Sequence, residues 1–211
     1  VDTITANRGN DKVSAGDAND TIIFGDNLTA NDSIDGGAGT DILTFTDADG
    51  ATTDLDQVTN IEIITLGNAL TSITTLDTLV ANGSTLTVNA NALTGASTLT
   101  WNGVLETNGN FSITGSAGAD LITAGAGNDT ITGANGDDTI NAGGGNDSIV
   151  SGDGSDTINL GVQLSLNDTI DGGTGIDTLT FTDADGLTTD LNRVTNIEII
   201  TLGNALTSIT T

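Results

Sequence analysis

The sequence predicts an all-β fold, a parallel β-roll or β-helix solenoid with no helices of note. Two observations predict it. Nine-residue repeats recur over two separate stretches of the chain, each ending in a short triplet such as Thr130-Ile131-Thr132. Between these stretches apolar and polar residues alternate, Thr is abundant, and no segment sustains a helical period. One triplet buries too little surface alone, so the repeats must stack to share a core.

The chain also contains about one and a half copies of a longer unit. Residues 1–75 align without a gap on residues 137–211, an offset of 136. The stretch 45–75 differs from 181–211 at only three positions. We therefore expect a fragment of a longer tandem array. We divide the chain into a first nonapeptide block (1–44), a spacer (45–114), a second nonapeptide block (115–180) and the start of a second spacer (181–211).

Every nonapeptide keeps an Asp at position six and an aliphatic residue at position eight. The position-six residues are Asp2, Asp11, Asp20, Asp32, Asp41, Asp120, Asp129, Asp138, Asp147, Asp156, Asp168 and Asp177. The position-eight residues are Ile4, Val13, Ile22, Ile34, Leu43, Ile122, Ile131, Ile140, Ile149, Ile158, Ile170 and Leu179. Three additional residues precede Asp32 and Asp168. Where other repeats have glycine, four positions depart from the pattern: Asn7, Ala18, Ala30 and Leu166.

This pattern predicts how the repeats stack. Successive side chains of a strand point to opposite faces, so position eight forms an aliphatic ladder inside. If each nonapeptide is a turn followed by a strand, two consecutive nonapeptides form one coil of the solenoid. Parallel strands of successive coils then lie about 4.8 Å apart. We expect Asp120 to lie over Asp138 and Asp138 over Asp156, with Asp129 over Asp147 in the other turns.

The charge of the chain points to a cation. Asp and Glu number 29 against three Lys and Arg, which gives a net charge of −26. Carboxylates stacked at strand spacing repel one another strongly unless a cation lies between them. Ca²⁺ takes six to eight oxygen ligands at about 2.3–2.6 Å, which Asp carboxylates and turn carbonyls can supply. We therefore predict several Ca²⁺ ions as cofactors, and a disordered chain in their absence.

The other residues of the turns support calcium over other metals. Glycine permits a positive φ, which would aim turn carbonyls inward at Gly118, Gly127, Gly136, Gly145 and Gly154. The chain has no His and no Cys, so zinc and copper are poor candidates. Mg²⁺ is disfavoured because its strict octahedron suits water better than a cage of carbonyls.

The repeats resemble a known family. Residues 36–44 and 172–180 match Gly-Gly-x-Gly-x-Asp-x-aliphatic-x at every fixed position, which resembles the RTX (repeats-in-toxin, hemolysin-type) calcium-binding nonapeptide. Residues 58–66 and 194–202, both VTNIEIITL, resemble stretches beside RTX repeats in large bacterial surface proteins. The resemblance implies a parallel β-roll, type I export of an unfolded chain, and folding in extracellular calcium. It implies as calcium ligands the twelve position-six Asp and nearby turn carbonyls, with the glycine positions Gly36, Gly39, Gly118, Gly127, Gly136, Gly145, Gly154 and Gly175.

Composition also disfavours several function classes. The strong negative charge disfavours nucleic acid as a partner. The commonest general base is missing, and acids recur on every coil instead of forming one contrasting pair, so we expect no enzyme and no catalytic residues. No apolar stretch approaches the length of a membrane span. We expect Trp101 in the spacer core rather than on a ligand platform.

One motif invites a different calcium site. The stretch FTDADG, at 45–50 and again at 181–186, spaces Asp and Gly as an EF-hand loop does. Its first position is Phe45, which cannot bind a metal, and its twelfth is Asp56 or Asn192 instead of Glu. We interpret it as a polar turn, with an accessory cation site as the alternative.

The sequence therefore predicts a calcium-binding structural solenoid segment of a secreted bacterial surface protein, such as an adhesin, surface-layer or filament subunit. We expect an extracellular, cell-surface location, with calcium ions and neighbouring copies of the chain as partners. The alternative is a carrier or secretion module of an extracellular protease, lipase or epimerase that is encoded outside this sequence. A third possibility is head-to-tail assembly into fibres through the coil ends.

Overall fold

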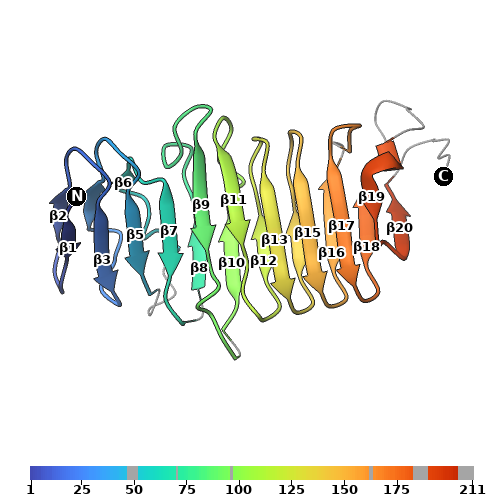
Figure 1. Cartoon of the computed structure of the whole chain (residues 1–211), viewed down its shortest axis with the longest axis horizontal. Helices are drawn as coiled ribbons and strands as arrows, with labels where there is room; N and C mark the ends of the chain where they lie inside the picture. Colours follow the sequence, from blue (N-terminus) through green and yellow to red (C-terminus); the bar gives the residue numbers. More distant parts are fainter. Residues whose placement is uncertain (47–51, 70, 96, 162–163, 183–189, 204–211) are drawn as a thin grey trace.

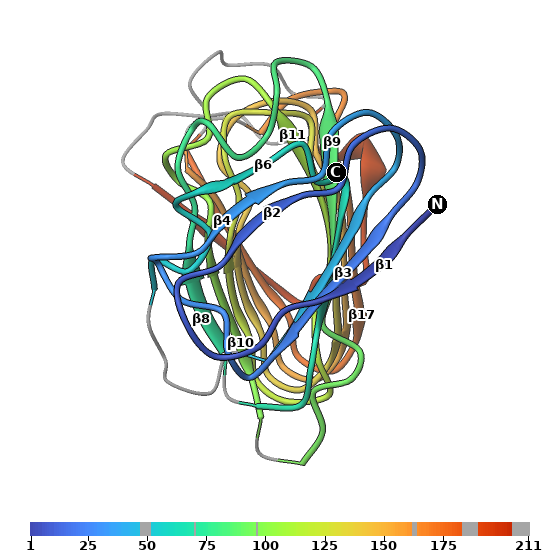
Figure 2. The same cartoon turned by 90° about the vertical axis from the view of Figure 1, so that its left-hand side faces the viewer.

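Successive strands alternate between two sides of a solenoid of about nine turns, which confirms the predicted fold class (Figure 1). The computed structural model describes residues 1–46, 52–69, 71–95, 97–161, 164–182 and 190–203. Within these residues all strand pairs are parallel, and the one helix is a short 3-10 turn, η1 (Asp190–Arg193). Viewed along the axis, the coils form a flattened ring around a shared interior (Figure 2).

Odd-numbered strands form one continuous ten-stranded sheet, in the order of the sequence. Its strands are β1 (Thr3–Thr5), β3 (Thr21–Gly25), β5 (Ile42–Phe45), β7 (Ile63–Leu66), β9 (Thr85–Asn89), β11 (Asn110–Thr114), β13 (Thr130–Asn135), β15 (Ser148–Asp153), β17 (Thr169–Thr174) and β19 (Val194–Thr195). This sheet crosses all three of the sequence boundaries between nonapeptide blocks and spacers.

Even-numbered strands form the opposite side, which is interrupted between β6 and β8. The first sheet of this side contains β2 (Lys12–Ser14), β4 (Ser33–Asp35) and β6 (Val58–Thr59). The second contains β8 (Thr71–Thr74), β10 (Leu99–Asn102), β12 (Leu121–Thr123), β14 (Thr139–Asn141), β16 (Thr157–Gly161), β18 (Thr178–Phe181) and β20 (Ile199–Leu202).

Strand register confirms the coil of two nonapeptides. Thr130 pairs with Ser148 and Ile131 with Ile149, so one coil in the second block spans two repeats of nine. The three-residue insertion before Asp168 lengthens the next coil, and Ile149 still pairs with Ile170. On the opposite side the register of β16 and β18 shifts between Asn159 and Gly161, just before the turn that holds the insertion.

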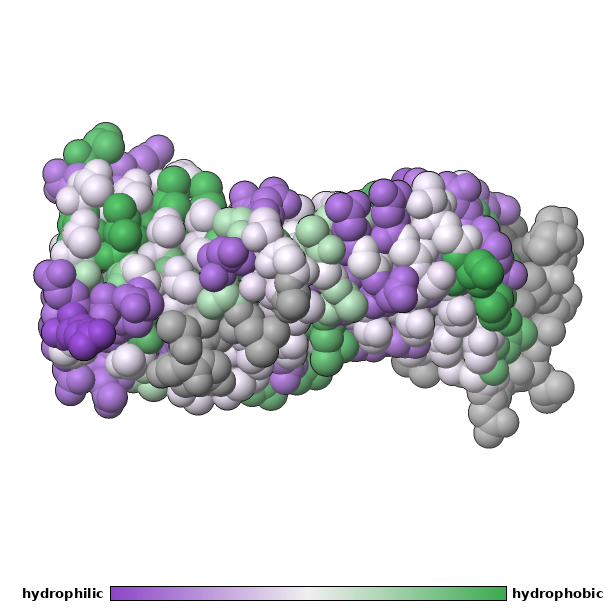
Figure 3. Space-filling view, turned by 90° about the horizontal axis from the view of Figure 1, so that it is seen from below, coloured by the Kyte–Doolittle hydropathy of each residue, from purple (hydrophilic) through white to green (hydrophobic). Residues whose placement is uncertain are grey.

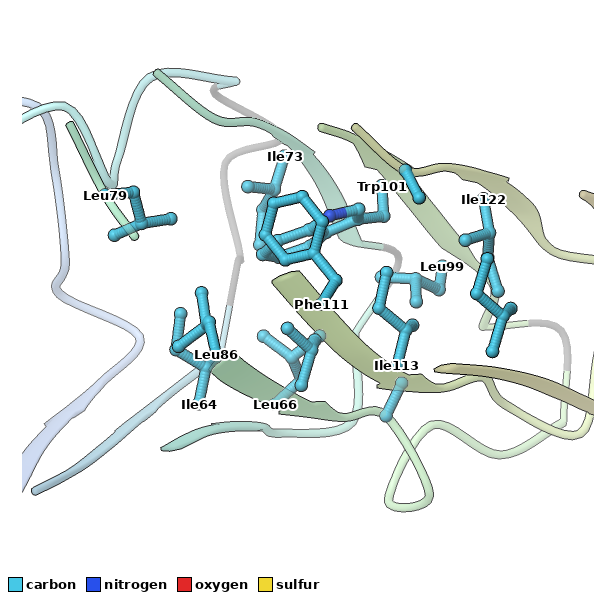
Figure 4. Packing of buried hydrophobic residues seen from close by; sticks show 14 of the residues in the cluster. Ile64, Leu66, Ile73, Leu79, Leu86, Leu99, Trp101, Phe111, Ile113 and Ile122 are labelled. Atoms are coloured by element: carbon cyan, nitrogen blue, oxygen red, sulfur yellow. The ribbon is translucent and has the colours of Figure 1, made fainter. Parts of the chain in front are cut away.

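The aliphatic ladder forms the core as expected. Eleven of the twelve position-eight residues are buried, and Ile4 in the first strand is partly buried. In the spacer, larger side chains take over this role (Figure 4). Trp101 and Phe111 are almost fully buried and pack edge to face, with ring centroids 5.6 Å apart. Trp101 is therefore a core residue, as the sequence suggested.

The spacer continues the same winding without the nonapeptide. Thr65 pairs with Asn89, and Asn89 with Thr114, so β7, β9 and β11 are consecutive neighbours. Coils in the spacer are longer than those of the second block, as the pairing of Thr71 with Leu99 shows. Longer and irregular turns account for the difference. The FTDADG motif lies largely outside the described residues, so its two interpretations stay predictions.

Equivalent strands of the two units lie on opposite sides of the solenoid. With the offset of 136 residues, β5 (Ile42–Phe45) in the first unit corresponds to β18 (Thr178–Phe181) in the second, and β7 corresponds to β20. The odd-numbered β5 and β7 belong to one side, and the even-numbered β18 and β20 to the other. One unit thus contains thirteen strands. Because two strands make one coil, thirteen strands make six and a half coils, and the next unit presents the same surface on the opposite side of the solenoid.

The outer surface is mainly polar, with separate apolar areas on the face that Figure 3 shows. The strand β20 exposes Ile199, Ile200 and Leu202 by 40–45%. Its counterpart β7 buries Ile64 and Leu66 completely. The difference arises because β9 pairs with β7, whereas no described strand pairs with the outer edge of β20.

Candidate calcium site

The position-six Asp side chains lie inside the solenoid, in the turn just before each strand. Ten of the twelve are at most 3% exposed; Asp11 is partly exposed and Asp2 is exposed. Charged groups are rarely buried unless they are paired. Across the described residues the only ion pair joins the amino terminus to Asp20, at 3.7 Å. The charge of the other buried carboxylates therefore has no protein cation to balance it.

In ten of the position-six Asp residues, from Asp20 onwards, one carboxylate oxygen accepts a main-chain N–H of the neighbouring coil. The Asp120 N–H donates to Asp138 Oδ1 at 2.8 Å, and the Asp138 N–H donates to Asp156 Oδ1 at 2.8 Å. The Asp129 N–H donates in the same way to Asp147 Oδ1 at 2.9 Å. These bonds confirm the predicted stacking, and they orient each side chain along the solenoid axis.

The second carboxylate oxygen has no hydrogen-bond partner in seven of these residues. The buried, unpartnered atoms are Oδ2 of Asp11, Asp20, Asp41, Asp129, Asp138, Asp156 and Asp177. Leaving a buried acceptor unsatisfied costs about 1–3 kcal/mol, and more for a charged group. Seven such atoms in equivalent positions are the signature expected of a ligand that binds at every coil.

Main-chain oxygens approach the same positions. A Cβ atom on Gly133 would clash with both Asp138 Oδ2 and the Ser151 carbonyl oxygen of the next coil. A Cβ on Gly36 would clash with the Asn60 carbonyl and would lie 2.9 Å from Asp41 Oδ2. Position one of these repeats thus needs glycine because a carboxylate and a carbonyl converge there, and oxygen pairs of this kind suit Ca²⁺.

Burial changes the acidity of the stacked carboxyls. Desolvation raises the pKa of Asp138 and of Asp147 to about 7, and that of Asp129 to about 6. Backbone N–H donors lower these pKa values, whereas neighbouring acids raise them further. The pKa of Asp177 is raised for the same leading reason. A bound cation would favour the ionised form that burial disfavours.

Most of the position-four glycines adopt the expected backbone. The φ angles of Gly136, Gly145 and Gly154 are +110°, +127° and +145°. Among the other predicted glycines, Gly39 and Gly175 are also positive, at +154° and +139°. Ala18 reaches +94° although it is not glycine, so the first block keeps this turn geometry despite the substitution.

The prediction of a positive φ at Gly118 and Gly127 is wrong, because neither residue adopts one. Close approach explains glycine at these two positions instead. A Cβ on Gly127 would clash with the Gly109 carbonyl, and one on Gly118 would lie 3.1 Å from the Ser97 carbonyl. Both contacts are made with the last coils of the spacer, where the second block begins.

Two glutamates that sequence reasoning missed extend the stacks. Glu62 Oε2 accepts the Asp41 N–H at 2.7 Å, and Glu198 Oε2 accepts the Asp177 N–H at 2.8 Å. Both lie in the VTNIEIITL stretch, one coil beyond the last nonapeptide of each block. The sequence offered one signal for these two residues, the rarity of glutamate, since the chain contains only three Glu among 29 acids.

A row of Asn side chains at position five was missed as well. The Asn128 N–H donates to Asn110 Oδ1 at 2.8 Å, and the Asn146 N–H donates to Asn128 Oδ1 at 2.8 Å. Asn128 and Asn146 are exposed and Asn110 is partly exposed, so this row lies outside the buried Asp residues. They explain the recurring Asn-Asp pair as two parallel rows, one outside the turn and one inside it.

Within the described residues, no group of three or more acidic side chains converges on one point. Each coil contributes one inward carboxylate per turn, so an ion between coils must take most of its ligands from main-chain carbonyls. Some of these already accept hydrogen bonds; the Gly16 carbonyl, for example, accepts the Ala38 N–H at 2.9 Å. A carbonyl oxygen retains a second lone pair for a cation.

The comparison with protein families agrees with this geometry. A model of the RTX calcium-binding nonapeptide repeat, written for four copies, matches residues 1–27, 28–47, 108–140, 132–163 and 165–180, more than half of the chain. The chain belongs to the RTX calcium-binding nonapeptide repeat family. No curated protein and no solved structure gave a significant match.

Family membership supports calcium as the ligand of the stacked turns, because RTX nonapeptides are calcium-binding motifs. RTX proteins are typically secreted by the type I route, which is consistent with an extracellular location. None of the helices in the described residues could cross a lipid bilayer.

Proposed function

We propose that this RTX chain is a calcium-dependent structural segment of a secreted bacterial surface protein, such as an adhesin, a surface-layer protein or a filament subunit. Calcium binding would drive folding after export. The observation that carries the proposal is the row of buried, unpartnered Oδ2 atoms, repeated on successive coils. A folded chain without cations must bury many uncompensated charges, whereas an unfolded chain keeps them in water.

Simple linkage shows that several ions suffice to control folding. A ligand that binds only the folded state at a hundred times its Kd stabilises that state by about 2.7 kcal/mol per site. Net stabilities of ordinary domains are about 5–15 kcal/mol. Four or five occupied sites would therefore contribute about as much as the entire net stability of such a domain.

The experiment is far-UV circular dichroism of the chain in EGTA and then in millimolar CaCl₂, with MgCl₂ as the matched control. We expect little β-structure in EGTA, cooperative formation of β-structure in calcium, and little response to magnesium. Equal β-structure in all three conditions would show that cations are not required for folding.

We propose a structural role and not an enzymatic one. The stacked acids share one environment on each coil, whereas acid–base catalysis by carboxyl groups requires two acids in contrasting environments. The long tandem unit, with its offset of 136, also favours a structural array. Hydrolysis assays with protein, ester and polysaccharide substrates in calcium are expected to give no activity above buffer.

Assembly with neighbouring copies and a cell-surface location are part of the proposal. Polymerisation through coil ends would be visible by electron microscopy in calcium, and surface exposure by antibody labelling of the producing cells. The alternative role, a secretion module for an enzyme, is supported by the type I route that RTX proteins typically use. The full reading frame distinguishes the two, because a catalytic domain beside the repeats would favour the module.

A further inference from the structure

Glu106 is a buried acid that lies outside every nonapeptide. It lies between β10 and β11 of the spacer, and its side chain is fully buried. Its Oε1 accepts the Gly109 N–H at 2.8 Å and the Asn108 N–H at 3.2 Å. Its Oε2 is buried and has no hydrogen-bond partner. Holding the loop requires only one of the two oxygens, so the loop does not explain why a charged residue is buried here.

A second unpartnered carboxylate oxygen lies on the adjacent coil. Asp129 Oδ1 accepts the Phe111 N–H at 2.7 Å, and Asp129 Oδ2 is buried without a partner. The Gly125 N–H lies close enough to the Asp129 carboxylate to lower the pKa of that carboxyl. Gly125 touches Glu106 as well, since a Cβ there would lie 2.5 Å from the Glu106 carbonyl oxygen and 3.0 Å from Glu106 Cβ. The two acids thus flank the same glycine.

The surroundings leave the pair of charges uncompensated. The charge of Glu106 raises the pKa of Asp129, in addition to the effect of burial. The only ion pair of the described residues lies at the amino terminus, far from this loop. A surface groove runs beside this loop, and Val104, Glu106 and Gly125 are among the residues that line it.

We infer that Glu106 Oε2 and Asp129 Oδ2 bind a divalent cation of the calcium type at the junction of the spacer and the second block. Two carboxylate oxygens without nitrogen or sulfur donors suit Ca²⁺, and carbonyls or water would complete its coordination. The inference rests on the proposed function for the identity of the ion. It adds a ligand from the spacer, so the calcium-binding stack would begin before the first nonapeptide of the second block.

The only Trp of the chain lies beside this site. Trp101 packs edge to face on Phe111 (Figure 4). The Phe111 N–H donates to Asp129. Tb³⁺ replaces Ca²⁺ in sites with oxygen ligands. It emits light when a nearby indole absorbs ultraviolet light and transfers the energy to the ion. Emission excited through Trp101 should therefore report on ions in the turns beside β10, at Glu106 and Asp129 and also near Asp120, which accepts the Leu99 N–H. The change caused by Glu106→Gln isolates the first of these sites.

The experiment titrates Tb³⁺ into the calcium-loaded chain with excitation at the indole band. We expect Trp-sensitised emission from the unaltered chain. Glu106→Gln keeps an acceptor for the Gly109 and Asn108 N–H groups but removes the charge. We expect at least about tenfold weaker Tb³⁺ binding in this signal, the scale on which metal-site partners act.

The control is Asp26→Asn, which removes the charge of an exposed acid outside the stacks, directly after β3 and four strands from β11 in the same sheet. At about 4.8 Å per strand it lies about 19 Å away, so the sensitised emission should stay unchanged. Trp101→Phe should abolish the emission without lowering the number of Tb³⁺ ions bound.

Two results would overturn the inference. The first is a folded Glu106→Gln chain that titrates like the unaltered one, and the second is an unaltered, folded chain without Trp-sensitised emission. Failure of the unaltered chain to fold in calcium would instead contradict the proposed function. If Glu106→Gln does not fold, the emission of the unaltered chain decides.

Discussion

The two oxygens of a stacked carboxylate have different roles. In Asp138, Oδ1 is committed to the Asp120 N–H, and Oδ2 is left for a ligand. A charge-assisted hydrogen bond of this kind fixes the side chain, so the free oxygen is already in place when a cation arrives. The cost of burying the charge is the reason that the fold should depend on that cation.

Substitution of one stacked Asp tests this division. Asp138→Asn keeps an acceptor for the Asp120 N–H but weakens one or two ion sites. We expect a loss of up to about 3 kcal/mol of stability in excess calcium, measured by urea denaturation. The control Asp137→Asn changes the exposed neighbour and should cost less than about 0.5 kcal/mol. Equal losses in the two variants would contradict a special role for the inward carboxylate.

The raised pKa values predict opposite pH dependences with and without calcium. Folded Asp129, Asp138 and Asp147 hold protons up to about pH 6–7, whereas the unfolded carboxyls ionise near 3.8. The calcium-free fold is therefore favoured at low pH and loses stability as the pH rises through about 6–7.

Circular dichroism in EGTA should accordingly show more β-structure at pH 5 than at pH 8. Calcium binding needs ionised carboxylates, so the calcium concentration at half-folding should fall as the pH rises from 5 to 8. A calcium midpoint that does not vary with pH would contradict the burial of titrating ligands.

Turns between strands are specified by backbone contacts as much as by side chains. Gly154 has a φ of +145°, and a Cβ there would clash with the Gly136 carbonyl of the coil below. Gly161 has a φ of +60°, and no atom lies within 4 Å of the place that a Cβ would occupy. Both turns need a left-handed residue, but only the first also needs the absence of a side chain.

These two glycines separate strain from close approach. Gly161→Ala should cost about 1–2 kcal/mol, the penalty for an L-residue in the left-handed region. Gly154→Ala should cost more than about 3 kcal/mol, because the coils must also move apart. Thermal or urea unfolding in calcium measures both. Equal losses of stability in the two variants would show that the close contact between Gly154 and the Gly136 carbonyl adds no penalty of its own.

Much of the regular structure could be predicted from the sequence because each nonapeptide marks its own strand. Position eight identified the core, and position six identified the stacked carboxylates. Glu62 and Glu198 were not predicted, because a longer side chain reaches the same N–H from a turn without the glycine pattern. Glu106 lies in a loop whose shape depends on contacts with Gly125, which no local pattern specifies.

The winding of the spacer could not be predicted from the sequence either. Its register separations vary, and its ladder positions hold apolar residues such as Leu99 and Phe111, whose N–H groups donate to the first Asp of each stack. Without a marker residue, its strands cannot be counted from the sequence. The half-turn between units follows from that count and so could be seen only in the structure.

Cysteine cross-linking tests the count across the spacer, and the chain has no Cys of its own. Thr65 and Asn89 are register partners on neighbouring strands, whereas Asn102 lies on the opposite side. Oxidation in calcium should join cysteines at Thr65 and Asn89 but not at Thr65 and Asn102, as mass spectrometry would show. The reverse result would contradict the thirteen-strand unit.

Along the entire solenoid, the charge of −26 and the stacked carboxylates describe one property, dependence of the fold on calcium. The most direct test measures bound calcium and β-structure in the same samples through one titration. We predict that several ions bind per chain, and that binding and β-structure rise together in a single cooperative transition from an unfolded chain in EGTA. A chain that is already folded in EGTA, or that folds before it binds calcium, would contradict this account.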